Sequence, residues 1–184
     1  MSLDRRTFLK TGVAGFGSIM MMPSCLNRTS SSWQFFTDEE ATCVIALCEQ
    51  IVPADEHGGG ATEAGVISYI DRQLVAVFDY DQVLYQQGIS ALQNCSLDLH
   101  GKRFEALDKD TQYILCTAME EGTLPEEYWG ELDQGRFFQL VIGHTMQGFY
   151  GPPRHGGNKD YMSYAMMGLD FPLVIGRNHY EHLS

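Results

Sequence analysis

Apolar residues recur at helical spacing along most of the chain, and the first predicted helix begins at Thr37. Thr37 and Glu40 have the spacing of a capping box, in which each side chain binds the backbone of the other residue. Pro53 ends this helix because proline lacks the backbone N–H that a helix interior needs. The apolar stripe of the predicted helix consists of Val44, Ile45, Leu47, Cys48, Ile51 and Val52.

The same periodicity predicts four more helices. They are expected at about Thr62–Phe78, from a cap at Asp81, from Asp110 or Thr111, and at about Glu131–Phe149, with a turn at Asn94–Gly101. The residues expected to face inward include Val66, Ile67, Ile70, Leu74, Val77, Phe137, Phe138, Leu140, Val141 and His144. The third and fourth helices carry the apolar residues Val83, Leu84, Ile89, Leu92, Ile114, Leu115, Ala118 and Met119. No stretch alternates with the period of two that marks a strand. The predicted fold is therefore all-α, a compact bundle of about five helices without a substantial sheet.

Two glycine-bearing segments stand out between and after these helices. Pro53–Gly65 contains three consecutive glycines, which favour a loop. His144–Gly168 carries glycine, proline, asparagine and aspartate together, so we expect a long Gly/Pro-bearing loop at the C-terminal end of the fold. Irregular stretches of this length are usually functional or disordered, and the interleaved aromatic residues argue against disorder.

The first ten residues combine basic residues with an apolar pair. The residues concerned are Arg5, Arg6, Phe8, Leu9 and Lys10. A weakly apolar run over residues 11–22 follows, and it is too short to cross about 30 Å of hydrocarbon as a helix. This layout is typical of a bacterial twin-arginine (Tat) export signal, although Asp4 stands where Ser or Thr is usual; a disordered basic N-terminus is the alternative. We expect a Tat signal and linker over residues 1–30, a single helical domain over residues 31–184, and a periplasmic location.

Cys25 is a candidate for lipidation. The small residue Ser24 before it fits a lipoprotein box, whereas Met22 and Pro23 depart from the usual residues. A lipid on Cys25 would hold the domain at a membrane surface without spanning it. Without the lipid, we expect any membrane association to be indirect.

The net charge of the chain argues against some classes of binding partner. Its formal net charge is −12, and residues 1–30 hold four basic residues and one acidic residue, so the rest of the chain is near −15. An acidic body of this kind argues against binding nucleic acid or anionic lipid headgroups.

Five cysteines are present, at positions 25, 43, 48, 95 and 116, and none is in a CxxC pair. This spacing indicates neither a zinc ribbon nor an iron–sulfur site. One or two disulfides could form in an exported domain, and the alternative is that the cysteines are small buried hydrophobes.

Both glycine-bearing segments resemble a known family. The C-terminal segment reads HTMQGFYGPPRHGGNKD, the upstream segment reads IVPADEHGGGATEAGVISYIDRQL, and YQQGISAL lies between them. In this order the segments resemble the gluconate 2-dehydrogenase subunit 3 family and cover most of the chain after residue 30. The sequence departs from the family pattern at Pro152, where Asp is usual, and at Tyr164, where Trp is frequent.

The resemblance implies a non-catalytic role for this chain. Such small subunits accompany a large flavoprotein of the glucose–methanol–choline (GMC) type, which binds FAD and carries out the hydride chemistry, and often a cytochrome c subunit. The small subunit carries the Tat signal and takes the large subunit across the membrane. The resemblance thus implies no catalytic, cofactor-binding or metal residue in this chain.

Twelve motif residues are candidates for contacting the partner or ordering the loops. They are Asp55, Glu56, His57, His144, Phe149, Tyr150, Arg154, His155, Gly156, Gly157, Asn158 and Asp160. We expect Arg154 to pair with an acid such as Asp160, and binding of a small anion is the alternative. The nearby methionines Met162, Met166 and Met167 are expected in the core or on a surface that packs on the partner.

A second hypothesis is a free-standing periplasmic metal-binding or redox enzyme that uses His57, His144 and His155. Against it, the sequence contains no GxGxxG, HExxH, CxxCH or GxSxG motif.

Overall fold

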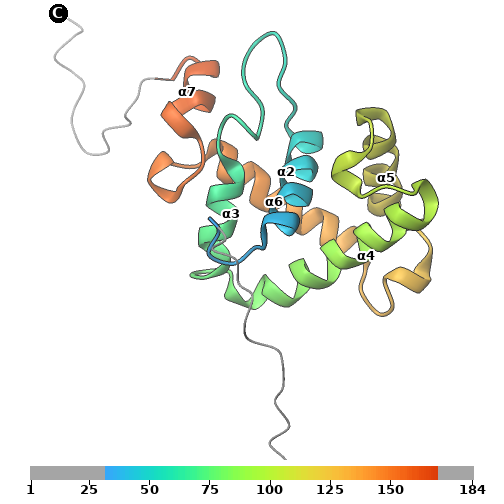
Figure 1. The fold of residues 1–184 in the computed structure, drawn as a ribbon. Coiled ribbons are helices and arrows are strands. Elements are labelled where there is room, and N and C mark those ends of the chain that lie inside the picture. Colours follow the sequence, from blue (N-terminus) through green and yellow to red (C-terminus); the bar gives the residue numbers. More distant parts are fainter. Residues whose placement is uncertain (1–31, 170–184) are drawn as a thin grey trace, which may run out of the picture. The chain divides into compact units, whose positions relative to one another are not determined.

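The computed structural model describes residues 32–169, which form six α-helices and no strand (Figure 1). The helices are α2 (Asp38–Ile51), α3 (Val66–Leu74), α4 (Gln82–His100), α5 (Lys109–Glu121), α6 (Gln134–Tyr150) and α7 (Met162–Met166). Short 3-10 turns lie at Asp79–Asp81, Phe104–Ala106, Glu126–Tyr128, Pro153–His155 and Lys159–Tyr161. The predicted all-α bundle is confirmed, with the small helix α7 added to the five that were expected.

Helices α2 and α6 form the centre of the bundle. They pack against each other, with α3 on one side and α5 on the other, and α4 runs along one end (Figure 1). Helix α7 packs on the C-terminal part of the fold, next to α6.

Side-chain caps explain where three of the helices begin. The capping box of α2 is present, because Thr37 accepts from the backbone of Glu40 and Glu40 accepts from the backbone of Thr37. Asp108 caps α5 and Asp133 caps α6, each by accepting a backbone N–H three residues later.

Several predicted helix boundaries are wrong, among them the end of α3, at Leu74 rather than Phe78, and the start of α6, at Gln134 rather than Glu131. Helix α3 starts at Val66 rather than Thr62, because Glu49 holds the backbone and hydroxyl of Thr62 and Gly65 has a left-handed φ of 71°. The turn predicted over Asn94–Gly101 is helix as far as His100, and only the left-handed Gly101 ends α4.

Val77, which was expected to face inward, is exposed, and so are the apolar helix residues Val83 and Ile114. Val77 follows the end of α3 and is 65% exposed, and Val83 lies in the first turn of α4 and is 60% exposed. Ile114 is 62% exposed because its neighbour Leu115 takes the inward direction on α5. The C-terminal loop is also shorter than expected, since α6 continues to Tyr150 and α7 begins at Met162.

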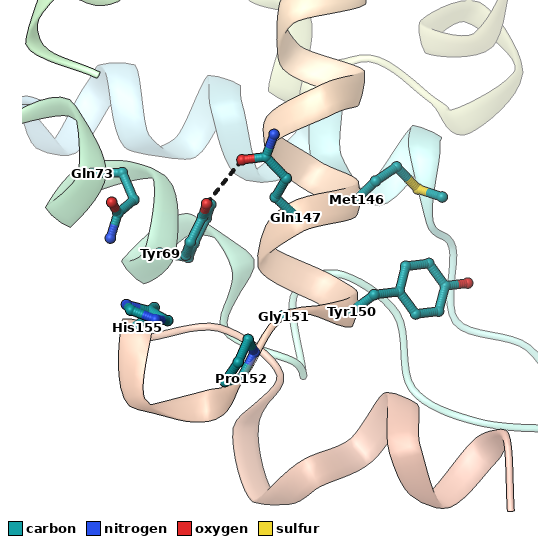
Figure 2. Close-up of a pocket in the computed structure, with 8 residues that line it drawn as sticks. All are labelled: Tyr69, Gln73, Met146, Gln147, Tyr150, Gly151, Pro152 and His155. Atoms are coloured by element: carbon teal, nitrogen blue, oxygen red, sulfur yellow. Dashed lines mark hydrogen bonds between the residues drawn. The ribbon is translucent and has the colours of Figure 1, made fainter. Parts of the chain in front are cut away.

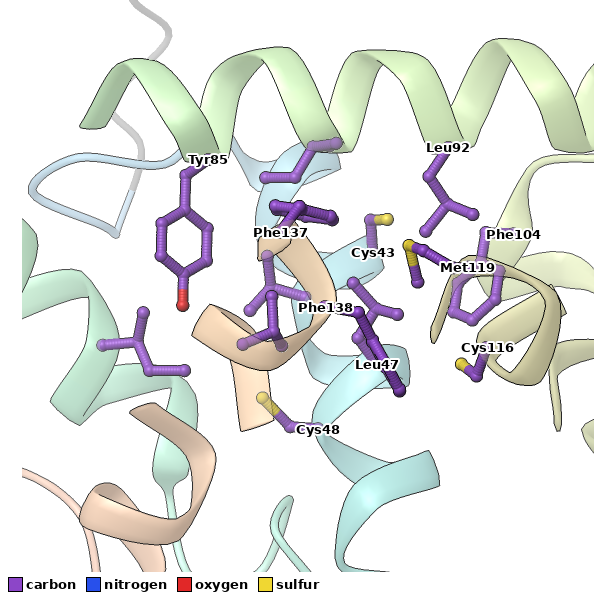
Figure 3. Close-up of a cluster of buried hydrophobic side chains, with 14 of the residues drawn as sticks. Cys43, Leu47, Cys48, Tyr85, Leu92, Phe104, Cys116, Met119, Phe137 and Phe138 are labelled. Carbon is purple, nitrogen blue, oxygen red and sulfur yellow. The ribbon is translucent and has the colours of Figure 1, made fainter. Parts of the chain in front are cut away.

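The core lies where α2, α4, α5 and α6 meet (Figure 3). Its largest fully buried side chains include Phe36, Leu47, Tyr85, Leu92, Phe104, Met119, Phe137 and Phe149. Burial of each such side chain contributes about 1.5–3 kcal/mol.

The four cysteines of the described part, Cys43, Cys48, Cys95 and Cys116, are free and buried, so no disulfide joins them. Burial raises the pKa of all four thiols, to about 12 for Cys48 and Cys116. They fill core space in the manner of small hydrophobes.

Asp71 of α3 fastens the first described residues to the bundle. Its carboxylate accepts backbone N–H bonds from Gln34 at 2.7 Å, Phe35 at 2.9 Å and Phe36 at 3.2 Å. Asp71 is only 3% exposed, so these three bonds supply the partners that a buried carboxylate requires. The sequence analysis did not find this role.

Candidate functional site

The two motif segments, almost a hundred residues apart in sequence, are in contact. The backbone N–H of Lys159 donates to the carbonyl of Ala64 at 3.0 Å, and Gly65 faces the carbonyl of Gly156. We call the loop at residues 53–65 and the loop at residues 151–161 together the two-loop surface.

The glycines of the second loop allow it to lie against the helices. Gly156 has a φ of 108° and packs on the Ser68 carbonyl and the Arg72 side chain. Gly157 lies directly on the carbonyl of Gly148 in α6, so a side chain there would collide with backbone. Glycine is therefore required at position 157 for close approach and at position 156 also for its φ.

Asn158 ties the second loop together. It is fully buried and left-handed, with a φ of 44°. Its side-chain amide donates to the carbonyl of Gly151 and its side-chain oxygen accepts from the backbone of Ser163, both at 2.9 Å. Asp160 and Tyr161 are also left-handed, which is uncommon for residues other than glycine.

The first loop is ordered mainly by carboxylates. Asp55 accepts from the backbone N–H groups of His57 and Gly58, at 2.8 and 3.1 Å. Glu56 and His57 point outward, with side chains 87% and 77% exposed and 3.6 Å apart. Glu49, which the sequence analysis did not single out, holds Ala54 and Thr62 across the loop.

Arg154 and His155 are exposed on the second loop. The Arg154 guanidinium donates to Nε2 of His155 at 3.0 Å. The ion pair expected between Arg154 and Asp160 is not among those formed in residues 32–169, and Asp160 is exposed. The charge of Arg154 therefore faces solvent rather than fastening the loop.

A shallow pocket of about 430 Å³ lies beside this loop, between α3 and the end of α6 (Figure 2). It is lined by Tyr69, Gln73, Met146, Gln147, Tyr150, Gly151, Pro152 and His155. The Tyr69 hydroxyl donates to the side chain of Gln147 at 2.9 Å across its back wall. Tyr150 and His155 belong to the C-terminal motif and were candidates from the sequence. The pocket residues Tyr69, Gln73, Met146 and Gln147 were not, because in the sequence they look like ordinary solvent-facing helix residues.

Phe149 and Tyr150 divide between core and surface. Phe149 is 1% exposed and Tyr150 is 43% exposed, and their rings meet edge to face at 5.0 Å. Of the three methionines, Met162 packs against the core, whereas Met166 and Met167 are 44% and 48% exposed.

His144 lies in the core and not on the two-loop surface. Its ring stacks on Phe78 at 4.4 Å, its Nδ1 is 3.1 Å from the Tyr85 hydroxyl, and its Nε2 is 3.7 Å from Asp81. Burial raises the pKa of Tyr85 well above its usual value, so the hydroxyl stays protonated. The Asp81 carboxylate beside Nε2 favours the neutral tautomer with its proton on Nε2, and in that tautomer Nδ1 accepts from the Tyr85 hydroxyl.

This burial predicts a pH dependence of stability. Desolvation lowers the pKa of His144 to about 4, so the fold favours the neutral ring over the charged one. The stabilisation is complete above the unfolded-state pKa of about 6.5 and is lost as the pH falls towards 4. We expect the free energy of unfolding to drop by about 2 kcal/mol between pH 7.5 and pH 5 from this group alone.

Urea unfolding at the two pH values measures this loss. His144→Gln should remove most of the pH dependence, whereas His57→Gln, at an exposed histidine, should leave it unchanged. Equal pH dependence in all three proteins would assign the loss to other groups.

The three histidines of the metal-enzyme hypothesis contact different residues. His57 is beside Glu56, His144 is beside Tyr85 and Asp81, and His155 is beside Arg154. Among residues 32–169, no three His, Cys, Asp or Glu side chains are arranged to hold a metal ion.

The export and lipidation candidates lie outside the described residues. These are Arg5, Arg6, Phe8, Leu9, Lys10 and Cys25. Within residues 32–169, no helix is both long enough and apolar enough to cross a membrane.

Comparison with known proteins gives one match. The family model described as gluconate 2-dehydrogenase subunit 3 matches residues 38–170, which include both motif loops and all six described helices. No curated protein and no solved structure matches the chain. Since the family model covers more than two thirds of the sequence, the chain belongs to the gluconate 2-dehydrogenase subunit 3 family, which places it in a multi-subunit dehydrogenase complex.

Proposed function

We propose that this chain is the non-catalytic small subunit of a periplasmic, flavin-dependent gluconate or sugar dehydrogenase. Its large partner is a GMC-type flavoprotein that holds FAD, and a cytochrome c subunit accepts the electrons. The small subunit carries the Tat signal, exports the large subunit with itself and stabilises it. Its membrane association is indirect or through a lipid on Cys25.

Membership of the subunit 3 family over residues 38–170 carries this proposal. The geometry of the motifs supports it. The side chains of Asp55 and Asn158 form hydrogen bonds with nearby backbone, and His144 is buried in the core. The motif residues therefore build a shaped surface, as a docking subunit requires, rather than converge on a reacting atom.

Co-production with a GMC-type flavoprotein, the proposed large subunit, tests the proposal. We expect the two proteins to purify together from the periplasm. Changing Arg5 and Arg6 together to lysine should leave both in the cytoplasm, because the Tat route depends on the arginine pair. The matched control is Arg28→Lys, which keeps the pair and should be exported normally.

A flavoprotein that reaches the periplasm and is fully active without this chain would overturn the proposal. Turnover of a sugar by the isolated small subunit would favour the second hypothesis, the free-standing enzyme.

A further inference from the structure

The second loop, residues 151–161, and the adjoining part of α3 carry more positive than negative charge in an otherwise acidic protein. Arg154 and Lys159 are exposed on this loop beside one acidic residue, Asp160, and Arg72 of α3 packs against Gly156. The charged residues of the first loop, by contrast, are all acidic: Asp55, Glu56 and Glu63. No carboxylate among residues 32–169 forms an ion pair with Arg154, so its charge is available to a binding protein.

Apolar side chains lie next to this charge. Met146 and Tyr150 are one turn apart on α6, are 40% and 43% exposed, and line the pocket that His155 also lines (Figure 2). A pocket of about 430 Å³ with aromatic, methionine and proline walls has room for one or two large side chains. An apolar pocket with a cationic rim matches a segment that presents an aromatic or aliphatic anchor beside carboxylates.

We propose that the large subunit docks here, through an acidic segment whose apolar side chain enters this pocket. This inference rests on the proposed function and names the surface that performs it. An acidic segment is repelled by most of the domain, including the first loop, whereas Arg72, Arg154 and Lys159 outnumber Asp160 in the second loop and the adjoining part of α3. The loops are held by Asn158 and the Gly157 contact, so little ordering is needed on binding.

A second exposed apolar group lies at the turn between α3 and α4. It consists of Val75, Val77, Tyr80 and Val83, which are 42% to 72% exposed. Asp79 and Asp81 stand within this group, and no lysine or arginine lies between positions 73 and 101. An acidic segment would meet like charges there, so this group provides a comparison surface.

Charge reversal on the full-length, co-produced complex tests the inference. Arg154→Glu with Lys159→Glu should weaken association by about 30-fold, and Met146→Glu should also weaken it, because each opposes an acidic or apolar partner group. The matched controls are Lys102→Glu with Lys109→Glu, which gives the same change in net charge, and Val83→Glu, which gives the same substitution on the comparison surface. The measurement is the dissociation constant at two salt concentrations.

We expect the controls to bind as the unaltered protein does, and the salt dependence to shrink only in the Arg154/Lys159 variant. If the unaltered subunits associate and both pairs of variants weaken binding equally, the docking surface is elsewhere and the proposed function stands. If the unaltered subunits do not associate, the proposed function itself fails. Thermal unfolding of each isolated variant separates lost binding from lost folding.

Discussion

Gly157→Ala is expected to lower the free energy of unfolding by about 3 kcal/mol, near the upper end of the usual range for overpacked sites. The added methyl group would meet the backbone carbonyl of Gly148, which α6 holds in place and which cannot rotate away as a side chain can. For a domain of this size, the loss corresponds to a fall of about 6–12 °C in the melting temperature. Thermal unfolding followed by circular dichroism measures it.

Gly143→Ala is the matched control, because it adds the same methyl group within α6, the helix that Gly157 contacts. Outside the nearby backbone of α6 itself, no atom lies within 4 Å of the position that this methyl group would occupy. Alanine there should stabilise the protein by about 0.5–1 kcal/mol, since alanine favours the helix. The two substitutions should therefore have opposite signs, and two small changes of the same sign would contradict the close contact at position 157.

Asp71→Asn is expected to cost about 2–3 kcal/mol of unfolding free energy. An amide has a single acceptor oxygen, and its NH₂ group would face a backbone N–H, so at least one of the bonds to Gln34, Phe35 and Phe36 must be lost. The remaining bonds also lose the added strength that a charged acceptor provides. Urea unfolding measures the total loss, and hydrogen exchange at residues 34–36 should show faster exchange there than elsewhere.

Asp79→Asn provides the comparison for Asp71→Asn. Asp79 is exposed, and its replacement makes the same change in charge, so its effect should stay within about 0.5 kcal/mol. Equal losses in the two variants would indicate a general effect of net charge instead of the three bonds to Asp71.

Features set by neighbouring residues were predictable from the sequence. The capping box at Thr37, the end of the first helix before Pro53 and the break at Gly122 depend on local chemistry, and all three are present in the structure. The start of α3 was missed because it depends on Glu49, thirteen residues before Thr62. Val77 was placed inward because periodicity gives the phase of a helix and not the residue at which the helix ends.

In the candidate site, too, the motif residues could be predicted from the sequence and the long-range contacts could not. The motif residues could be found in sequence because glycine, asparagine and proline mark unusual backbone. The contact between the loops at residues 53–65 and 151–161 could not be predicted, because it is a tertiary contact. The hydrogen bond from the Lys159 backbone to the Ala64 carbonyl is part of it. Tyr69 and Gln147 become pocket residues because α3 packs on α6, and Asp71 contacts partners 35 to 37 residues away.

The burial of the four cysteine thiols determines how the protein responds to oxidants. Oxidants and disulfide catalysts act on the thiolate, and the raised pKa values of Cys48 and Cys116 leave almost none of it at neutral pH. The four thiols should therefore stay reduced in an oxidising environment. The stability of the protein should be the same with and without dithiothreitol.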